Sequence, residues 1–325
     1  MSDVAIELDG QYRALREEAG AARRERGVLV VRGQDAAEYL QGQLTNDIEV
    51  LESGQGAYSA LLDRKGKMQA DMRVLRTADD VRIGLEPEAL AVTLRHLTMY
   101  AIGRDVSVED HTDELALISV VGPASSQLTG LPPLAAENDH APAELDGIEA
   151  TVVRTDLGLD LVVDASDADG ALAAVEKRGV APVSEDALEI VRVENGRPRF
   201  GREMTQETIP QEAGINERAV SFTKGCYIGQ ETVARLHYKG KPNRHLRGLR
   251  LSGPAEAGAV VTLGERELGK VGTAVLSPAH GAIALAILRR EATPGDEVAV
   301  GGETSAEVVD LPFERCDTTG DLSVE

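Results

Sequence analysis

The sequence is poor in cysteine and in large aromatic residues, with two cysteines, no tryptophan and three phenylalanines in 325 residues. Cys226 and Cys316 lie far apart and supply no disulfide framework. No charged and then apolar segment opens the chain, so we expect free thiols in a cytoplasmic protein. The longest apolar run, residues 281–288, is far shorter than the roughly 18 residues that cross a bilayer. We therefore expect no membrane partner.

Motifs for metals and nucleotides are also missing. The six histidines show no HxH or HxxxH spacing, and the cysteines form no CxxC pair, so neither a zinc site nor a permanent iron–sulfur site is expected. No GxGxxG or Walker pattern occurs, which argues against a nucleotide cofactor. We expect no metal bound by this chain.

Basic residues are few relative to acidic ones, 34 against 55, and the net charge is −21. This excess of negative charge argues against direct nucleic-acid binding. One segment, residues 218–250, differs and carries a formal charge of +7. Its basic members are Arg218, Lys224, Arg235, Lys239, Lys241, Arg244, Arg247 and Arg250. The segment either attracts an anionic ligand or partner, or it packs against acidic neighbours in the same fold, and the sequence leaves both alternatives open.

Hydrophobic periodicity predicts an α+β fold in the first part of the chain. The expected elements are a strand at 28–31, a helix at 36–43, a hairpin of 57–62 and 68–75, a strand at 81–85 and a helix at 87–97. A similar order returns with strands at 118–121 and 159–163, followed by helices from 125 and at 167–178. We therefore expect two related halves about 80 to 90 residues apart.

The remaining segments differ in texture. Residues 130–147 read as a solvated loop, and residues 185–194 as a helix that Ser184 caps and a following glycine ends. From residue 245 onward, short β runs between Gly/Pro turns predict a small antiparallel barrel. An acidic tail follows from residue 303, and we expect its last eight residues to be loose. The expected domains are a body at 1–244, with interleaved halves of about 1–110 and 111–244, and a barrel at 245–325.

The motif TKGCYIGQE, at residues 223–231, carries the strongest functional signal. Cys226 lies two residues after Lys224 and before a segment of good helix formers that begins at Gln230. A nearby ammonium and the free N–H groups of a helix start both stabilise a thiolate. A buried cysteine in a glycine-bounded turn is the structural alternative.

Four segments, in order, resemble the folate-binding YgfZ/GcvT-like family, and the fourth is similar to its YgfZ branch. They are YLQGQLTNDI at 39–48, LLDRKGKMQAD at 61–71, RVENGRPRFG at 192–201 with IPQE at 209–212, and KGCYIGQE at 224–231. The resemblance implies a cloverleaf of α+β halves around a central channel, with a C-terminal barrel as the third leaf.

The resemblance also implies a ligand, tetrahydrofolate or a derivative. Glu194 falls at the position where family members pair a glutamate with the amide N–H and exocyclic amine of the pterin, and a carboxylate offers two acceptors for those donors. Asn46, Asp47 and Asp71 fall where related aminomethyltransferases line the channel. Those enzymes carry an acidic pair where this chain has Ala70 and Asp71. The missing acid argues against aminomethyltransferase activity.

The YgfZ branch implies an accessory role: the folate-binding protein supports assembly or repair of iron–sulfur clusters in client enzymes, including tRNA-modifying enzymes. Cys226 would be the reactive thiol, Lys224 its electrostatic partner, and Tyr227, Gln230 and Glu231 its surroundings. Client proteins would bind through the basic segment 218–250. Two alternatives stay open, a folate-dependent aminomethyl transferase and a folate sensor that docks partners through the same basic segment.

Overall fold

The computed structural model describes residues 3–313, which form two compact units. The first unit contains the chain up to Leu188 and again from Met204 to Pro242, and the second contains Glu189–Glu203 and the chain from Asn243 onward. No helix within the described residues is long and apolar enough to cross a membrane. Cys316 and the last eight residues, which the sequence predicts to be loose, lie outside the described residues.

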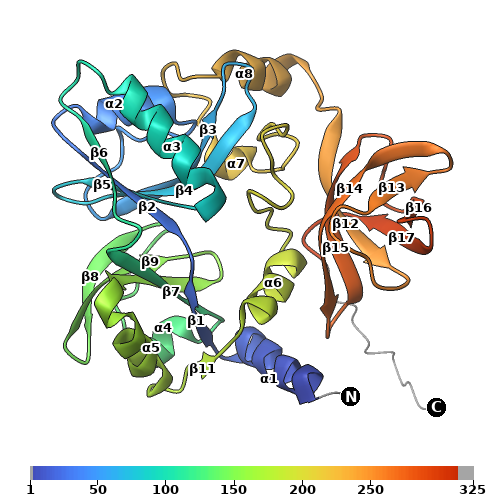
Figure 1. Cartoon of the computed structure of the whole chain (residues 1–325), viewed down its shortest axis with the longest axis horizontal. Helices are drawn as coiled ribbons and strands as arrows, with labels where there is room; N and C mark the ends of the chain where they lie inside the picture. Colours follow the sequence, from blue (N-terminus) through green and yellow to red (C-terminus); the bar gives the residue numbers. More distant parts are fainter. Residues whose placement is uncertain (1–2, 314–325) are drawn as a thin grey trace, which may run out of the picture. The chain divides into compact units, whose positions relative to one another are not determined.

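The first unit contains two sheets (Figure 1). One has the strand order β3-β4-β5-β2-β6, with β2 (Gly27–Arg32), β3 (Gln55–Leu62), β4 (Met68–Arg76), β5 (Val81–Leu85) and β6 (Ser107–Asp110). The other has the order β11-β1-β7-β10-β9-β8, with β1 (Gly20–Arg24), β7 (Leu115–Val121), β8 (His140–Leu145), β9 (Ile148–Arg154), β10 (Gly158–Asp164) and β11 (Ala181–Pro182).

The helices of this unit are α1 to α8 in chain order. They are α1 (Asp3–Glu17), α2 (Ala36–Gln43), α3 (Pro87–Tyr100), α4 (Ser125–Thr129), α5 (Ala168–Glu176), α6 (Glu185–Glu194), which crosses into the second unit, α7 (Asn216–Ala219) and α8 (Gln230–Lys239), besides a short 3₁₀ turn at Ala165–Asp167. Helix α3 packs on the five-stranded sheet and α5 on the six-stranded one (Figure 1). Pro87 suits the first turn of α3 because its missing N–H has no partner there.

The two halves exchange a strand. In chain order β1 directly precedes β2, yet it pairs with β7 of the other sheet, whereas β6 directly precedes β7 and pairs with β2. Both exchanged strands are antiparallel to their partners. The repeat predicted from sequence is therefore present, and the swapped strands tie the halves into one unit.

Two glycines mark equivalent points of this repeat. Gly33 ends β2 with φ +117°, and a Cβ there would lie 1.9 Å from the carbonyl oxygen of Asp105. Gly122 ends β7 with φ +134°, and a Cβ there would lie 2.5 Å from the carbonyl oxygen of Glu18. Only glycine fits both the backbone angle and the close approach of the incoming strand.

The second unit holds a closed barrel. Its strand order is β12-β15-β14-β13-β16-β17, with β12 (Arg244–Leu251), β13 (Val260–Leu263), β14 (Arg266–Ser277), β15 (Gly281–Arg289), β16 (Glu297–Val300) and β17 (Thr304–Val309). Alternating residues such as Val261, Ala284 and Val308 fill its interior. The expected α+β fold, with two related halves and a C-terminal antiparallel barrel, is confirmed.

One expectation about the chain path is wrong. Residues 130–147, predicted as a solvated loop, contain strand β8, and both His140 and Leu145 are buried. Pro142 and Glu144 hide this strand in the sequence, because proline and acidic residues are depleted in strands. Pairing with β9 along its whole length supplies the missing stabilisation.

Candidate functional site

A cavity of about 230 Å³ lies within the first unit and is lined by both sheets. The strands place alternate side chains on opposite faces, so Ile118, Leu159 and Leu161 pack in the core that contains α5, while Ser119 and Asp160 line the cavity. Apolar strand residues such as Met72 and Leu85 also line the cavity, so its wall is part polar and part apolar. A cavity of this size accommodates a ring system.

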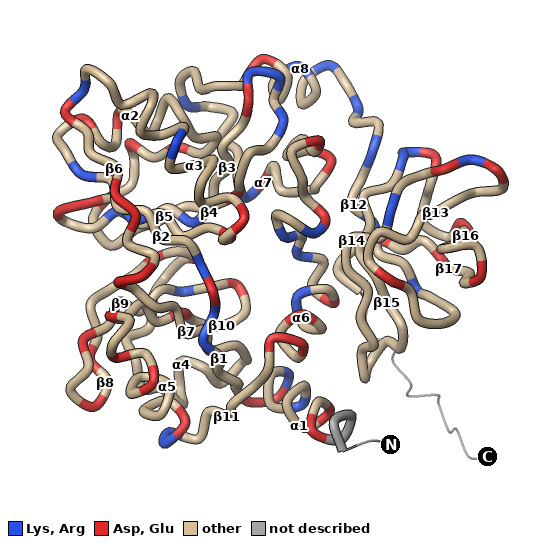
Figure 2. The backbone as a smooth tube through the Cα atoms, in the orientation of Figure 1, with Lys and Arg blue, Asp and Glu red and all other residues tan. Residues whose placement is uncertain are grey.

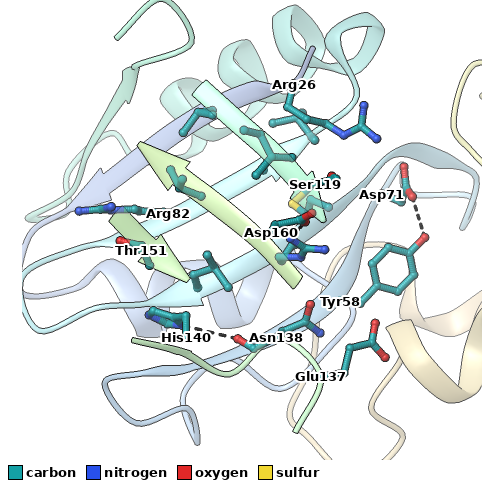
Figure 3. Close-up of a pocket in the computed structure, with 18 of the residues that line it drawn as sticks. Arg26, Tyr58, Asp71, Arg82, Ser119, Glu137, Asn138, His140, Thr151 and Asp160 are labelled. Atoms are coloured by element: carbon teal, nitrogen blue, oxygen red, sulfur yellow. Dashed lines mark hydrogen bonds and ion pairs between the residues drawn. The ribbon is translucent and has the colours of Figure 1, made fainter. Parts of the chain in front are cut away.

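Tyr58 and Asp71 stand together at one end of the cavity (Figure 3). In the β3–β4 hairpin Ala60 pairs with Asp71, and Tyr58, two residues before Ala60, lies on the same face of β3. The Tyr58 hydroxyl donates a hydrogen bond of 2.6 Å to Asp71 Oδ2. Asp71 Oδ1 is buried and receives no hydrogen bond from another described residue. A ligand with an N–H or O–H donor fits this free acceptor.

The environment makes the Asp71 carboxyl a weak acid. Burial raises its pKa from 3.8 to about 6, the nearby Glu86 carboxylate adds to the rise, and the hydrogen bond from Tyr58 opposes it. The pKa of Tyr58 is raised well above its usual value by burial and by Asp71. A carboxyl with a pKa near neutrality can exchange a proton with a bound amine or ring nitrogen.

This perturbed carboxyl predicts a pH-dependent stability difference for Asp71→Asn. Folded Asp71 keeps its proton up to about pH 6, whereas the unfolded chain loses it near 3.8, so ionisation favours unfolding as the pH rises through this window. We expect the variant to be more stable than the wild type by about 3 kcal/mol near pH 8 and by only about 0.5 kcal/mol near pH 4. Urea unfolding at both pH values measures this. The same difference at both pH values would contradict it.

Arg218 covers the Tyr58 end of the cavity. Its guanidinium carbon lies 5.0 Å from the centre of the Tyr58 ring, and its Nη2 forms an ion pair with Glu137 and lies 3.7 Å from Asp156. Further along, Arg73 and Asp160 form an ion pair that joins the two sheets. His140 lines the far end with its Nε2 buried and unpartnered among the described residues, and burial lowers its pKa.

The Cys226 loop is built differently. Cys226 is exposed, four residues before α8 begins at Gln230, whereas Lys224 is buried. The Lys224 ammonium donates three hydrogen bonds, of 2.6, 2.7 and 2.7 Å, to the carbonyl oxygens of Gln41, Leu44 and Asn46. Burial lowers the pKa of Lys224 to about 8, and the Asp47 and Glu49 carboxylates oppose the shift.

This geometry gives Lys224 a role that the sequence does not suggest. All three of its N–H groups are used by the 41–46 segment, and its Nζ lies 5.2 Å from the centre of the Tyr227 ring. Lys224 thereby anchors the loop that presents Cys226. Stabilisation of a Cys226 thiolate by Lys224 and a helix start stays a prediction.

The other residues expected around the cysteine lie on the same loop and helix. Tyr227 is buried, and burial raises its pKa to about 12. The backbone N–H of Gln230 donates to the Tyr227 carbonyl, and Glu231 is exposed in the first turn of α8. Their roles around a reactive thiol stay predictions.

Asn46 connects the Cys226 loop to the cavity. Its carbonyl accepts from Lys224, and its Nδ2 donates to the carbonyls of Tyr58 at 2.8 Å and Arg218 at 3.0 Å. The neighbouring Asp47 accepts a hydrogen bond of 2.8 Å from Gln41. Asn46 thus contacts both Lys224 and the backbone of Tyr58, the residue that donates to Asp71. Asp47 is held by Gln41, whose carbonyl also binds Lys224.

Glu194 belongs to the second unit, at the end of α6. Its side chain is buried, Oε1 accepts a 2.5 Å hydrogen bond from the Ser277 hydroxyl, and its backbone carbonyl accepts from the N–H of Phe313. A buried carboxylate held in one orientation is suited to recognising paired donors. Its assignment to a pterin stays a prediction.

Sequence reasoning missed several cavity residues, namely Tyr58, Glu137, His140 and Asp160. Tyr58 could have been predicted from the sequence, because the register of the predicted hairpin places it beside Asp71. The sequence contains no signal for Asp160, because its partner Arg73 lies 87 residues away and their contact depends on how the two sheets pack. Among the described residues, no group of three His, Cys, Asp or Glu side chains could hold a metal ion.

Known proteins share this architecture over most of the chain. Residues 8–224 match the GCVT N-terminal domain. The chain is 33% identical over 258 residues to the tRNA-modifying protein YgfZ of Vibrio vulnificus, which covers 78% of this chain and 76% of the relative. It is 29% identical over 332 residues to an aminomethyltransferase of Rubrobacter xylanophilus, covering 95% and 88% of the two chains.

A solved structure agrees in fold. The glycine cleavage system aminomethyltransferase T from Bartonella henselae aligns with a TM-score of 0.83 at 23% identity, covering 94% of this chain and 89% of that one. The match of the GCVT N-terminal domain to two thirds of the sequence and the identity with YgfZ agree with each other. The chain belongs to the YgfZ/GcvT-like family.

Proposed function

We propose that this chain is a tetrahydrofolate-binding accessory protein that supports assembly or repair of iron–sulfur clusters in client enzymes, tRNA-modifying enzymes among them. The observation that carries the proposal is the exposed Cys226 on a loop anchored by the buried Lys224. A thiol that is solvent-exposed and rigidly presented is suited to react with another protein. Relatives named tRNA-modifying protein YgfZ support the client class.

The cavity fits the folate part of the proposal. Asp71 offers a buried acceptor, and Tyr58 and Arg218 provide an aromatic face and a cation beside it. Asp71 would accept a hydrogen bond from a ring or bridging nitrogen of the folate. The motif resemblance separately predicts that Glu194 binds the donors of the pterin. The bound folate would supply a one-carbon unit or act as a ligand.

A second function is favoured by Asp71 itself. A buried carboxylate with a free oxygen and a pKa of about 6 is a suitable base for a folate-dependent aminomethyl transferase, the activity that gives several relatives their name. Ala70 before Asp71 leaves one acid on the strand, which favours the accessory role. The two functions share the folate site and differ in their need for Cys226.

Calorimetric titration with tetrahydrofolate tests the shared site. Glu194→Ala removes two charge-assisted hydrogen bonds to the pterin, so we expect the affinity to fall by about 2 kcal/mol, roughly thirtyfold. Ser277→Ala is the control: it removes the hydroxyl bound to Glu194 and keeps the carboxylate, so its loss should be smaller. An unchanged affinity of Glu194→Ala would remove Glu194 from the site.

A further inference from the structure

A surface of the first unit lies apart from the cavity and shares none of its lining residues. It is formed by the β3–β4 turn, the C-terminal end of α3 and the exposed side of α8, and we name it the α3–α8 surface. A Cβ on Gly66 in the turn would lie 2.9 Å from Thr232 of α8, so turn and helix pack closely. Between the turn and α3 lies a groove of about 260 Å³, whose lining includes Leu62, Arg64, Arg95, Met99, Tyr100 and Ile228.

The groove is apolar and lies beside the reactive loop. Ile228, which lines it, is two residues after Cys226. Met99 is 55% exposed and Tyr100 is 40% exposed, and both line the groove. Apolar side chains gathered at one place on a surface mark a site for a partner.

The same surface carries cations that form no ion pair with the described acidic residues. Arg64 and Lys65 lie in the turn, Arg95 on α3, and Arg235 and Lys239 on α8, and all five are exposed. Figure 2 shows Lys and Arg positions in blue around α8. None of these five forms an ion pair with a described acidic residue, although the protein carries a net charge of −21. The acid of the turn, Asp63, instead accepts hydrogen bonds from the backbone of Lys65 and Lys67. An acidic partner would supply the missing counter-charges.

We propose that the α3–α8 surface docks an acidic segment of a partner protein that carries an apolar anchor side chain. The anchor enters the groove beside Ile228, and the acids meet Arg64, Arg95 and Lys239. The partner is thereby held beside Cys226. That the partner is a client enzyme rests on the proposed function. That the partner segment is acidic with an apolar anchor rests on the charges and the groove of the α3–α8 surface.

A protein segment matches this surface better than a nucleic acid does. The ring centres of His96 and Tyr100 lie 4.6 Å apart and those of Phe222 and His237 lie 3.7 Å apart, and both pairs are stacked. The stacked faces of these rings are therefore not available to nucleic-acid bases. The negative charge of the whole chain repels a long polyanion. A groove lined by Leu62, Met99 and Ile228 accepts an aliphatic or aromatic side chain.

Fluorescence anisotropy with a labelled synthetic peptide tests the proposal. The probe is a short run of aspartate and glutamate around a leucine–phenylalanine pair. The double variant Arg64→Glu with Arg95→Glu should raise the Kd about tenfold or more, and Lys65→Glu with Lys239→Glu should also weaken binding. The matched control, Lys177→Glu with Lys270→Glu, changes the net charge equally at exposed positions elsewhere and should leave the Kd within about twofold.

Three results would overturn the docking proposal. They are equal weakening by the control pair, equal binding of a peptide whose leucine and phenylalanine are replaced by serine, and stronger binding of a single-stranded RNA than of the peptide. The assay contains no folate, and Cys226→Ala should bind the peptide normally. A wild-type chain that binds the peptide and fails to support client enzymes would count against the proposed function alone. Charge-reversal variants that bind the peptide as tightly as a wild-type chain that does support clients would count against the docking surface alone.

Discussion

Replacing Lys224 by methionine is expected to lower the free energy of unfolding by about 3 kcal/mol. Methionine keeps the length and the apolar stem of the side chain and donates no hydrogen bond. The carbonyls of Gln41, Leu44 and Asn46 then lose their shared donor in a region where water enters poorly. Each unsatisfied buried acceptor costs about 1 kcal/mol or more.

Urea unfolding of the wild type and the Lys224→Met variant measures this loss. Lys177→Met, which changes an exposed lysine, is the control and should shift the free energy of unfolding by less than about 0.5 kcal/mol. Faster amide hydrogen exchange should follow in residues 41–46 and 221–229, since Lys224 joins the two segments. Equal stability of the two variants would show that the three hydrogen bonds do not anchor the loop.

Replacing Cys226 by alanine is expected to abolish support of client enzymes while leaving the fold and folate binding intact. Cys226 is exposed and carries no part of the apolar core, so its loss should change stability by less than about 0.5 kcal/mol. The expected readout is the amount of thiomethylated nucleoside in tRNA, measured by mass spectrometry in a bacterium that lacks its own family member and expresses the variant.

Cys316→Ser is the matched control for this experiment. It removes the second thiol of the chain, which we expect to be a bystander, and it should support the clients as the wild type does. Full support by Cys226→Ala would make the thiol dispensable. The folate sensor that acts through docking alone would then explain the role better.

Local signals predicted the elements that are stabilised locally. Helices α2 and α6 and strand β5 begin and end where the sequence predicts, and Ser184 accepts the N–H of Ala187 at the start of α6. Elements stabilised by distant partners were missed. Strand β1, with the sequence GAARR, has little strand propensity and forms because β7 and β11 flank it. Strand β17 was read as acidic tail and closes the barrel against β12 and β16.

The residues of the candidate site also differ in whether local sequence signals could predict their contacts. Asp71 was predicted from its motif, and its partner Tyr58 could have been found from the hairpin register. The role of Lys224 could not have been predicted, because its acceptors are backbone carbonyls 178 to 183 residues earlier. Every residue has a backbone carbonyl, so the sequence does not show which carbonyls accept. The motif resemblance named Asp71 and Lys224, and the packing of distant segments decides what these residues contact.

Expression of the wild-type chain in two bacterial strains tests the central claim most directly. One strain lacks its own accessory family member, and the other lacks its aminomethyltransferase. The proposed function predicts restored tRNA thiomethylation in the first strain and no restored glycine cleavage in the second. Restored glycine cleavage without restored thiomethylation would contradict the accessory role and establish the transferase in its place.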